Sequence, residues 1–175
     1  MKSIHDQYYY YITELGHTHT TDFCMKLSND DLYDKDIRKR AIGFVEDLQQ
    51  SIKQSDVVVL GATEQSIGTG IFMYIAYTLS KPIVALCEDY QKIPFLYDAL
   101  NYKKLLIYEC GLTNYKQVIP NALMDAQKLV DKRFTLLLPP NMVELLEKNH
   151  KETGQNRSEY IRELIRRDMK LKAKS

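Results

Sequence analysis

The fold of this chain is decided by Ser55-Asp56-Val57-Val58-Val59-Leu60-Gly61, which continues through Ser66-Ile67-Gly68-Thr69-Gly70 to Pro82-Ile83-Val84-Ala85-Leu86-Cys87. Two segments, Val57 to Leu60 and Ile83 to Cys87, are apolar without interruption. Such runs are typical of strands that are covered on both faces of a parallel sheet. The residues between them, about Gly68 to Leu79, fit a helix. The stretch therefore predicts one βαβ unit.

The loop between the first strand and the helix contains Ser66, Gly68 and Gly70. Glycines let backbone N–H groups turn outward, and the N-terminus of a helix attracts negative charge. We expect this loop to bind an anion, and a phosphate fits best.

Length and composition indicate a soluble globular protein. The 175 residues are 45% hydrophobic, enough for one medium domain and a small appendage. No apolar run approaches the roughly 20 residues that span a bilayer, and the N-terminus lacks the apolar region of a signal peptide. We expect a cytoplasmic protein without membrane contact. The three cysteines and four histidines show no zinc spacing, so we expect neither a metal nor a cofactor.

Charge divides the chain into two parts. Residues 1–131 carry 13 Lys and Arg against 17 Asp and Glu, net −4, whereas residues 132–175 carry 11 against 6, net +5. We expect two domains with these boundaries. A basic unit suits a polyanion better than a small metabolite, and a merely solvated basic end is the alternative.

Predicted helices and strands alternate along residues 1–131. The patterns predict helices over Ile4–Leu15, Lys35–Gln54, Ile93 to about Asn101 and Pro120–Asp131, and strands over His17–Phe23 and Leu105–Cys110. We interpret the four tyrosines at 8–11 as packing residues, because consecutive side chains point all round a helix. The alternation predicts a doubly wound, flavodoxin-like or Rossmann-like α/β domain with a parallel sheet. Its usual first strand is missing, so either the sheet closes without it or the domain is a truncated version.

Four short motifs stand out in the first part of the chain: Leu15-Gly16, Gln54-Ser55-Asp56-Val57-Val58-Val59, Ser66-Ile67-Gly68-Thr69-Gly70 and Lys81-Pro82-Ile83-Val84. With these residues, the segment from Gly16 to Cys87 resembles the nucleoside 2-deoxyribosyltransferase superfamily, and within it the 2'-deoxynucleoside 5'-phosphate N-hydrolases. The resemblance implies a (deoxy)nucleotide ligand, with Asp56, Ser66, Gly68 and Gly70 at its site. Ser66 takes the position that binds the 5'-phosphate.

The acidic residues of that family are absent. Its nucleophilic glutamate falls on Phe72, and two further acidic positions fall on Leu48 and Gly61. Displacement at a sugar carbon needs a carboxylate to attack, which a phenyl ring cannot do. The resemblance therefore implies a degenerate domain, and we assign no catalytic residue. Substitution by Glu64 in the same loop is the alternative.

The end of the chain contains Arg133-Phe134-Thr135-Leu136-Leu137-Leu138-Pro139-Pro140, Met142-Val143-Glu144-Leu145-Leu146 and Thr153-Gly154-Gln155-Asn156-Arg157-Ser158-Glu159-Tyr160-Ile161-Arg162-Glu163-Leu164-Ile165. With these motifs, residues 132–175 resemble a ribbon-helix-helix domain. The pattern agrees, because Pro140 suits a first helical turn, Gly154 suits a helix end and Ser158 suits the cap of the next helix.

This segment is too small to bury a core alone, so we expect two chains to pair. The dimer interface should contain the apolar residues of the strand and second helix, which are Phe134, Leu136, Leu138, Ile161, Leu164 and Ile165. A homodimer or a higher homo-oligomer follows.

The same resemblance implies contacts to duplex DNA. The outward strand residues Arg133, Thr135 and Leu137 would meet bases in the major groove. The start of the second helix, Asn156, Arg157 and Ser158, would bind backbone phosphate. Leu137 departs from the family, whose third strand position is usually polar or basic, and this weakens sequence readout. Dimerisation without DNA binding is the alternative.

We therefore expect a dimeric DNA-binding regulator with a catalytically degenerate nucleotide-binding domain. Two alternatives remain open: a non-catalytic scaffold dimerised by its tail, and a deoxyribonucleoside 5'-phosphate N-glycosidase or deoxyribosyltransferase-like enzyme that uses altered residues.

Overall fold

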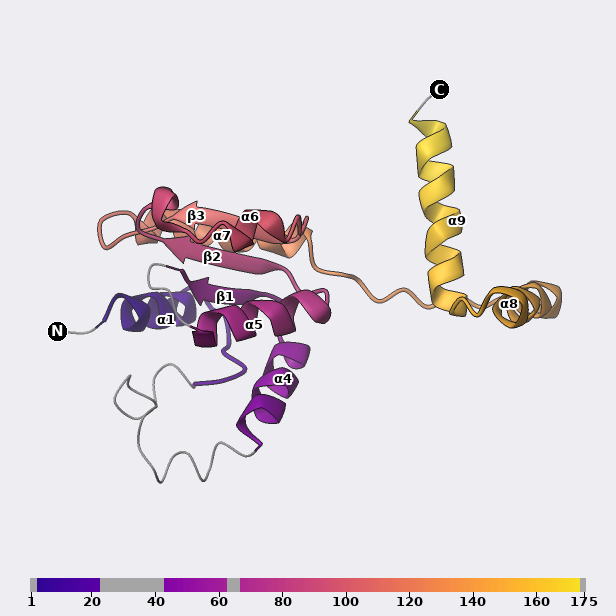
Figure 1. Cartoon of the computed structure of the whole chain (residues 1–175), viewed down its shortest axis with the longest axis horizontal. Coiled ribbons are helices and arrows are strands. Elements are labelled where there is room, and N and C mark those ends of the chain that lie inside the picture. Colours follow the sequence, from indigo (N-terminus) through magenta and orange to yellow (C-terminus); the bar gives the residue numbers. More distant parts are fainter. Residues whose placement is uncertain (1–2, 23–42, 63–66, 174–175) are drawn as a thin grey trace. The chain divides into compact units, whose positions relative to one another are not determined.

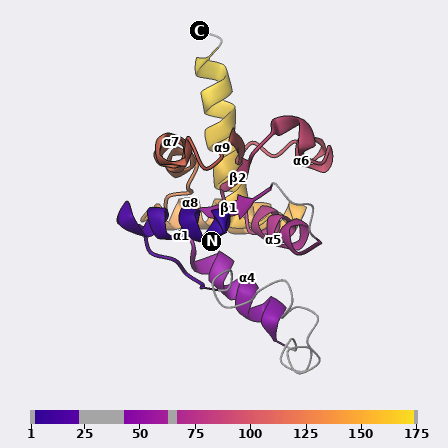
Figure 2. The ribbon, with the colours of Figure 1, turned by 90° about the vertical axis from the view of Figure 1, so that its left-hand side faces the viewer.

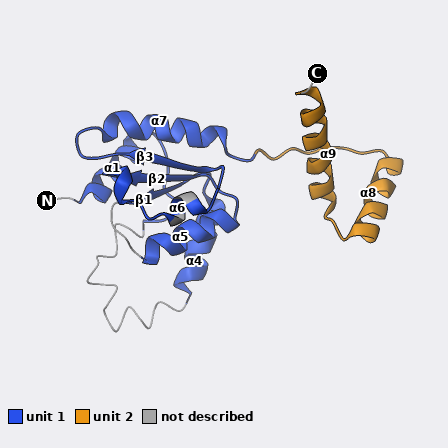
Figure 3. Cartoon of the chain, turned by 45° about the horizontal axis from the view of Figure 1, so that its top comes forward, with its two compact units in different colours: residues 1–131 blue, residues 132–175 orange. Residues whose placement is uncertain are grey.

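A computed structural model describes residues 3–22, 43–62 and 67–173 of the chain. The chain divides into two compact units, Met1–Asp131 and Lys132–Ser175 (Figure 3). We call them the α/β unit and the tail, and each is described by itself.

The α/β unit is built on a parallel sheet of three strands in the order β1-β2-β3. The strands are β1 Val58–Gly61, β2 Ile83–Cys87 and β3 Leu105–Glu109. The register pairs Leu60 with Ala85, and Ala85 with Ile107. Every residue of the central strand β2 is buried, as its uninterrupted apolar sequence predicts. The expected βαβ unit and the mixed α/β class are thus confirmed.

Helices cover both faces of this sheet (Figures 1 and 2). On one face, α1 Ile4–Glu14 and α7 Tyr115–Lys128 bury Ile12 and Ile119 against Val84 of β2. On the other face lie α4 Phe44–Gln54, α5 Ile67–Thr78 and the short α6 Leu96–Ala99. A 3-10 turn at Tyr90–Lys92 precedes α6 in the chain. The residues before Gly43 that we expected to be helical lie outside the described residues.

The strands run in one direction across the sheet, from β1 to β3. A doubly wound fold needs a reversal of strand order, and the described residues contain none, so that assignment stays a prediction. The strand expected over His17–Phe23 is wrong for residues 17–22, which pair with no strand, and Phe23 lies outside the described residues. Residues 17–21 line a cavity along the free edge of β1 instead of pairing with that strand, so they gain no ladder hydrogen bonds.

Helix α7 begins five residues earlier than we predicted and contains Pro120 in its interior. Proline has no N–H, so the carbonyl of Lys116, four residues earlier, loses its helical donor. The Tyr11 hydroxyl donates to that carbonyl at 3.0 Å. A side chain from α1 thereby replaces the missing hydrogen bond, which explains why the helix continues through the proline.

The tail consists of two helices after an extended segment. Helix α8 is Pro140–Thr153, with proline in its first turn, and α9 is Arg157–Lys172. Gly154, with φ of 71°, ends α8 in the left-handed conformation, as we predicted. Residues 132–139 have no regular structure in the single chain. Among the described tail residues, Leu146 is the buried apolar side chain, so the tail lacks a core of its own.

Candidate functional site

The residues of the expected anion site occupy two ends of β1. Gly68 and Gly70 lie in the first turn of α5, which follows the carboxyl end of β1, whereas Asp56 precedes its amino end. A strand rises about 3.3 Å per residue, so the length of β1 separates Asp56 from the glycines. The structure does not bring Asp56 together with them. Ser66 and Glu64 lie outside the described residues.

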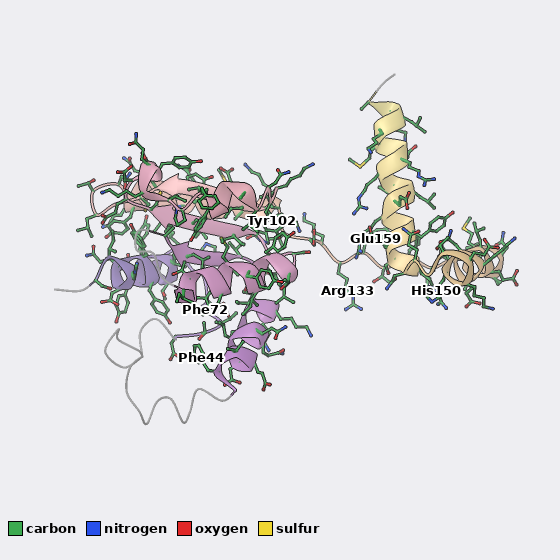
Figure 4. All side chains as sticks on the ribbon, viewed as in Figure 1. Phe44, Phe72, Tyr102, Arg133, His150 and Glu159 are labelled. Carbon is green, nitrogen blue, oxygen red and sulfur yellow. The ribbon has the colours of Figure 1, made fainter. Side chains whose placement is uncertain are left out.

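A cavity of about 480 Å³ lies along the outer edge of β1. Its apolar lining includes Ile12 from α1, Leu48 from α4 and Phe72 from α5, and the segment 17–21 also lines it (Phe72 is labelled in Figure 4). The N–H groups of Val58 and Ala62 bind carbonyls on the β2 side. Since neighbouring residues of a strand face opposite ways, the backbone groups of Val59 and Gly61 point away from β2. The cavity therefore combines apolar walls with backbone hydrogen-bonding groups.

The three positions that are acidic in the resembled family have other uses here. Leu48 is buried, and Phe72 packs against the same core. At Gly61, an added Cβ would lie 2.6 Å from Nε2 of His5, so the imidazole occupies the space beside this glycine. The buried Nε2 atom has no hydrogen-bond partner among the described residues. This wall can offer an imidazole nitrogen to a ligand but no carboxylate at these three positions.

Other polar groups around the cavity are held in place by one another. The ring of His19 stacks on Tyr9 at 3.7 Å between centroids, and its Nε2 lies 3.1 Å from both the Tyr9 carbonyl and Thr13 Oγ1. Sequence analysis missed this pair, because only the fold brings residues ten apart into one stack. The arrangement fixes the orientation of the 17–21 segment at the cavity.

The cysteines of the described residues are buried thiols. Burial raises the pKa of Cys87 and of Cys110, which keeps both in the unreactive protonated form at neutral pH. The hydroxyl of Tyr8 donates to the Cys110 carbonyl at 2.7 Å, and burial raises the pKa of this tyrosine. Among the residues that the structure describes, no three His, Cys, Asp or Glu side chains gather as metal ligands.

In the tail, the extended segment exposes residues expected to meet DNA bases and apolar residues expected at the dimer interface. Arg133, labelled in Figure 4, is exposed, and so is Thr135. Phe134 is 84% exposed and Leu137 is 93% exposed, values unusual for large apolar side chains. The apolar residues expected at the dimer interface are therefore largely uncovered in the single chain. Leu138 and Ile161 are half-buried, and Leu136, Leu164 and Ile165 are exposed.

The three expected phosphate ligands gather at the start of α9. Asn156 is the N-cap, and its Oδ1 accepts from the Ser158 N–H at 2.9 Å. Our prediction that Ser158 is the cap was wrong, because the helix begins one residue before the serine. An Asn-x-x-Glu pattern, Asn156 to Glu159, carries the signal for the true cap.

Arg157 is engaged within the tail. Its guanidinium donates to Oε1 of Glu147 on α8 at 3.2 Å. The turn between the helices is further held by Gln155, which donates to Glu163 at 3.0 Å and whose carbonyl lies 2.9 Å from His150 Nδ1. Sequence reasoning missed Glu147, since the turn geometry decides which acid of α8 reaches the arginine.

Two half-buried acids of α9, Glu159 and Glu163, are paired with its arginines. Glu159 accepts from Arg166 at 2.8 Å and from Arg162 at 2.9 Å, and these hydrogen bonds hold the pKa of its carboxyl below the ordinary value. Hydrogen bonds from Gln155 and Arg167 lower the pKa of Glu163 in the same way. At neutral pH both acids are therefore charged and partly neutralise the basic helix.

Residues 132–171 match the family described as "Ribbon-helix-helix protein, copG family". The tail is a ribbon-helix-helix domain. Proteins with this domain typically form homodimers and bind DNA. No curated protein and no solved structure matches the chain. The resemblance of residues 16–87 to nucleoside deoxyribosyltransferases is not supported by a family match and stays a prediction.

The extended segment, residues 133–138, lies at the start of the residues that match this family, and its large apolar side chains are mostly exposed in the single chain. None of the described helices is both long and apolar enough to cross a membrane.

Proposed function

We propose that this protein is a dimeric DNA-binding regulator whose ribbon-helix-helix tail contacts duplex DNA. The observation that carries the proposal is the family match, together with an extended segment whose apolar side chains lie uncovered in the single chain. The net charge of +5 in residues 132–175 favours a polyanion as the partner.

In the proposed dimer, two ribbon strands form an antiparallel pair. Phe134, Leu136 and Leu138 face the helices, with Ile161, Leu164 and Ile165 completing the interface. A chain truncated after Asp131 should then form a smaller assembly in light scattering. A truncated chain that keeps the full stoichiometry would place the interface in the α/β unit and contradict the proposal.

The opposite face of the ribbon would read bases through Arg133, Thr135 and Leu137. Arg133→Ala should cost about 1–3 kcal/mol on a cognate site and blur the preference at one base pair. Leu137→Arg should tighten binding to most sequences, because it adds a positive charge toward the phosphates.

At the start of α9, Asn156, Arg157 and Ser158 would bind backbone phosphate. Arg157→Ala should weaken cognate and random DNA alike and make the salt dependence shallower. Lys170→Ala is the matched control, because it removes the same charge from the last turn of the same helix. Thirteen residues at 1.5 Å each place it about 20 Å from the expected phosphate.

The deciding experiment is fluorescence anisotropy with DNA from the protein's own promoter and with random duplex, over a range of salt concentrations. The proposal expects binding at low salt, where electrostatic affinity is greatest. Wild-type protein that remains dimeric but binds neither duplex would instead support the non-catalytic scaffold.

For the α/β unit, we propose binding of a (deoxy)nucleotide without catalysis, with its phosphate at Ser66, Gly68 and Gly70. Support comes from the position of the glycines in the first turn of α5 and from the neighbouring cavity at β1. Asp56 is placed too far from the glycines to share that phosphate.

Calorimetry with dGMP and dCMP tests this second proposal. Ser66→Ala should weaken binding, whereas Thr78→Ala, a hydroxyl removed from the last turn of α5, should not. Release of free base at a rate abolished by Ser66→Ala would favour the enzyme alternative. Absence of binding by the wild-type protein would refute a nucleotide ligand.

A further inference from the structure

Helix α5 has an unusual surface for a helix on the outside of a sheet. None of its twelve residues, Ile67–Thr78, carries a charge. Met73 and Ala76 are buried against the sheet, so that face of the helix is accounted for. A helix that is apolar on its outer face as well indicates a second contact.

The outer face of α5 is a continuous apolar stripe. Ile67 is 87% exposed, Ile71 43%, Tyr74 62% and Tyr77 38%. Residues 67, 71 and 74 lie one above another at the helical spacing, and the Tyr77 ring adjoins Tyr74, with centroids 6.5 Å apart. No other described helix of the α/β unit exposes as many large apolar side chains.

Gly70 lies on the same stripe and has no packing partner that requires a glycine. A Cβ added there would meet nothing within 4 Å, and its φ is not positive. Glycine destabilises a helix relative to alanine, so its presence at this position needs a reason. Close approach of another helix would explain the missing side chain at this exposed position, as would the phosphate proposed above, because small residues let helix axes come near each other.

We propose that the outer face of α5 packs against α5 of a second copy of this chain, within the dimer held by the tail. A two-fold axis places the same stripe on both copies, so an uncharged surface meets itself without charge repulsion. The proposal therefore rests on the ribbon dimer of the proposed function.

The size of the stripe fits such a tethered contact. Taking about 200 Å² for each large side chain, the exposed fractions give about 450 Å² per copy. The pair would bury about 900 Å², below the roughly 1,200 Å² of a stable interface between free proteins. Tethering supplies the difference, since it raises the effective concentration to the millimolar range.

The ribbon also brings the two α/β units near each other. Six residues at about 3.3 Å each separate the starts of two antiparallel ribbon strands by about 20 Å. A 131-residue unit has a radius of gyration of about 14 Å, so it is wider than this separation. Neighbouring units of one dimer are thus close enough for their α5 faces to meet.

The test is cross-linking of the full-length chain with a short bifunctional maleimide. Ile71→Cys should give a covalent dimer at a rate independent of protein concentration. Met124→Cys, exposed on α7 at the opposite face of the sheet, is the control and should react far more slowly. Wild type measures the background of the native cysteines, and Tyr74→Cys repeats the test at a second position.

Truncation after Asp131 removes the tail and so tests whether the α5 contact depends on the dimer that the tail forms. At about 10 μM protein, the truncated Ile71→Cys chain should cross-link about a hundredfold more slowly, because the millimolar effective concentration is lost. The α5 contact is refuted, and the tail dimer stands, if light scattering shows an intact full-length dimer but neither Ile71→Cys nor Tyr74→Cys cross-links faster than Met124→Cys. A monomeric wild-type chain would refute both.

Discussion

Replacing Glu147 by glutamine should make this protein bind DNA more tightly. In the single chain the Glu147 carboxylate holds the guanidinium of Arg157, the residue we assign to a backbone phosphate. The carboxylate and the DNA therefore compete for one arginine. Removing the negative charge releases it without shortening the side chain that faces α9.

The expected size follows from the exposure of the pair, whose side chains are 46% and 54% exposed. Ion pairs this open to water contribute about 0.2–1 kcal/mol, so releasing Arg157 should tighten binding by at most about fivefold per copy. Arg157 contacts the phosphate in both proteins, so the slope of log K against log salt, which counts phosphate contacts at about 0.9 each, should change little. The two copies of the dimer together should tighten binding by at most about 25-fold.

The measurement is anisotropy titration at several salt concentrations, with Glu152→Gln as the control. Glu152 also lies on α8 and pairs with Lys148 at 3.9 Å, so its replacement changes net charge equally without touching Arg157. If the two variants behave alike, or if the effect of Glu147→Gln persists in an Arg157→Ala background, the competition does not exist.

Three further predictions concern stability. Tyr11→Phe should destabilise the α/β unit by about 0.5–1.5 kcal/mol in urea denaturation. Pro120→Ala, which restores the helical N–H, should remove most of that loss. If the effects of the two substitutions simply add, the Tyr11 hydroxyl does not replace the hydrogen bond missing at Pro120. Because the pKa of Glu159 is lowered, its stabilisation of α9 is present at neutral pH and is lost as the pH falls below about 4.5. Amide hydrogen exchange of α9 should show this loss in wild type and a smaller one in Glu159→Gln. Gly61→Ala should cost about 1–3 kcal/mol through its collision with the His5 ring, and His5→Ala should relieve it; equal thermal melting of wild type and Gly61→Ala would contradict the contact.

The elements that the sequence predicted correctly are those determined by residues within the element itself. The run Ile83–Cys87 is apolar at every position, and it forms the central strand with the bounds we expected. Gly154 ends α8 because a left-handed residue is needed there, and glycine adopts that conformation without strain.

The misses have causes outside the local sequence. Pro120 suggested a helix start, but a hydroxyl from a helix about a hundred residues earlier lets α7 continue through it. His17 to Thr21 alternate as in a strand, yet in the structure they line a cavity along the free edge of β1 and do not pair with it. Within the tail, the choice of Glu147 as the partner of Arg157 depends on how two helices meet, which no spacing rule encodes.

The outer edge of β1 has a consequence for how the protein behaves during folding and storage. An open strand edge invites pairing with strands of other molecules, which leads to aggregation. Here α1 and the segment 17–21 line the cavity along that edge, so access to its backbone groups is restricted. The irregular backbone of this segment then protects better than a strand, because it offers no second edge on which another chain could grow.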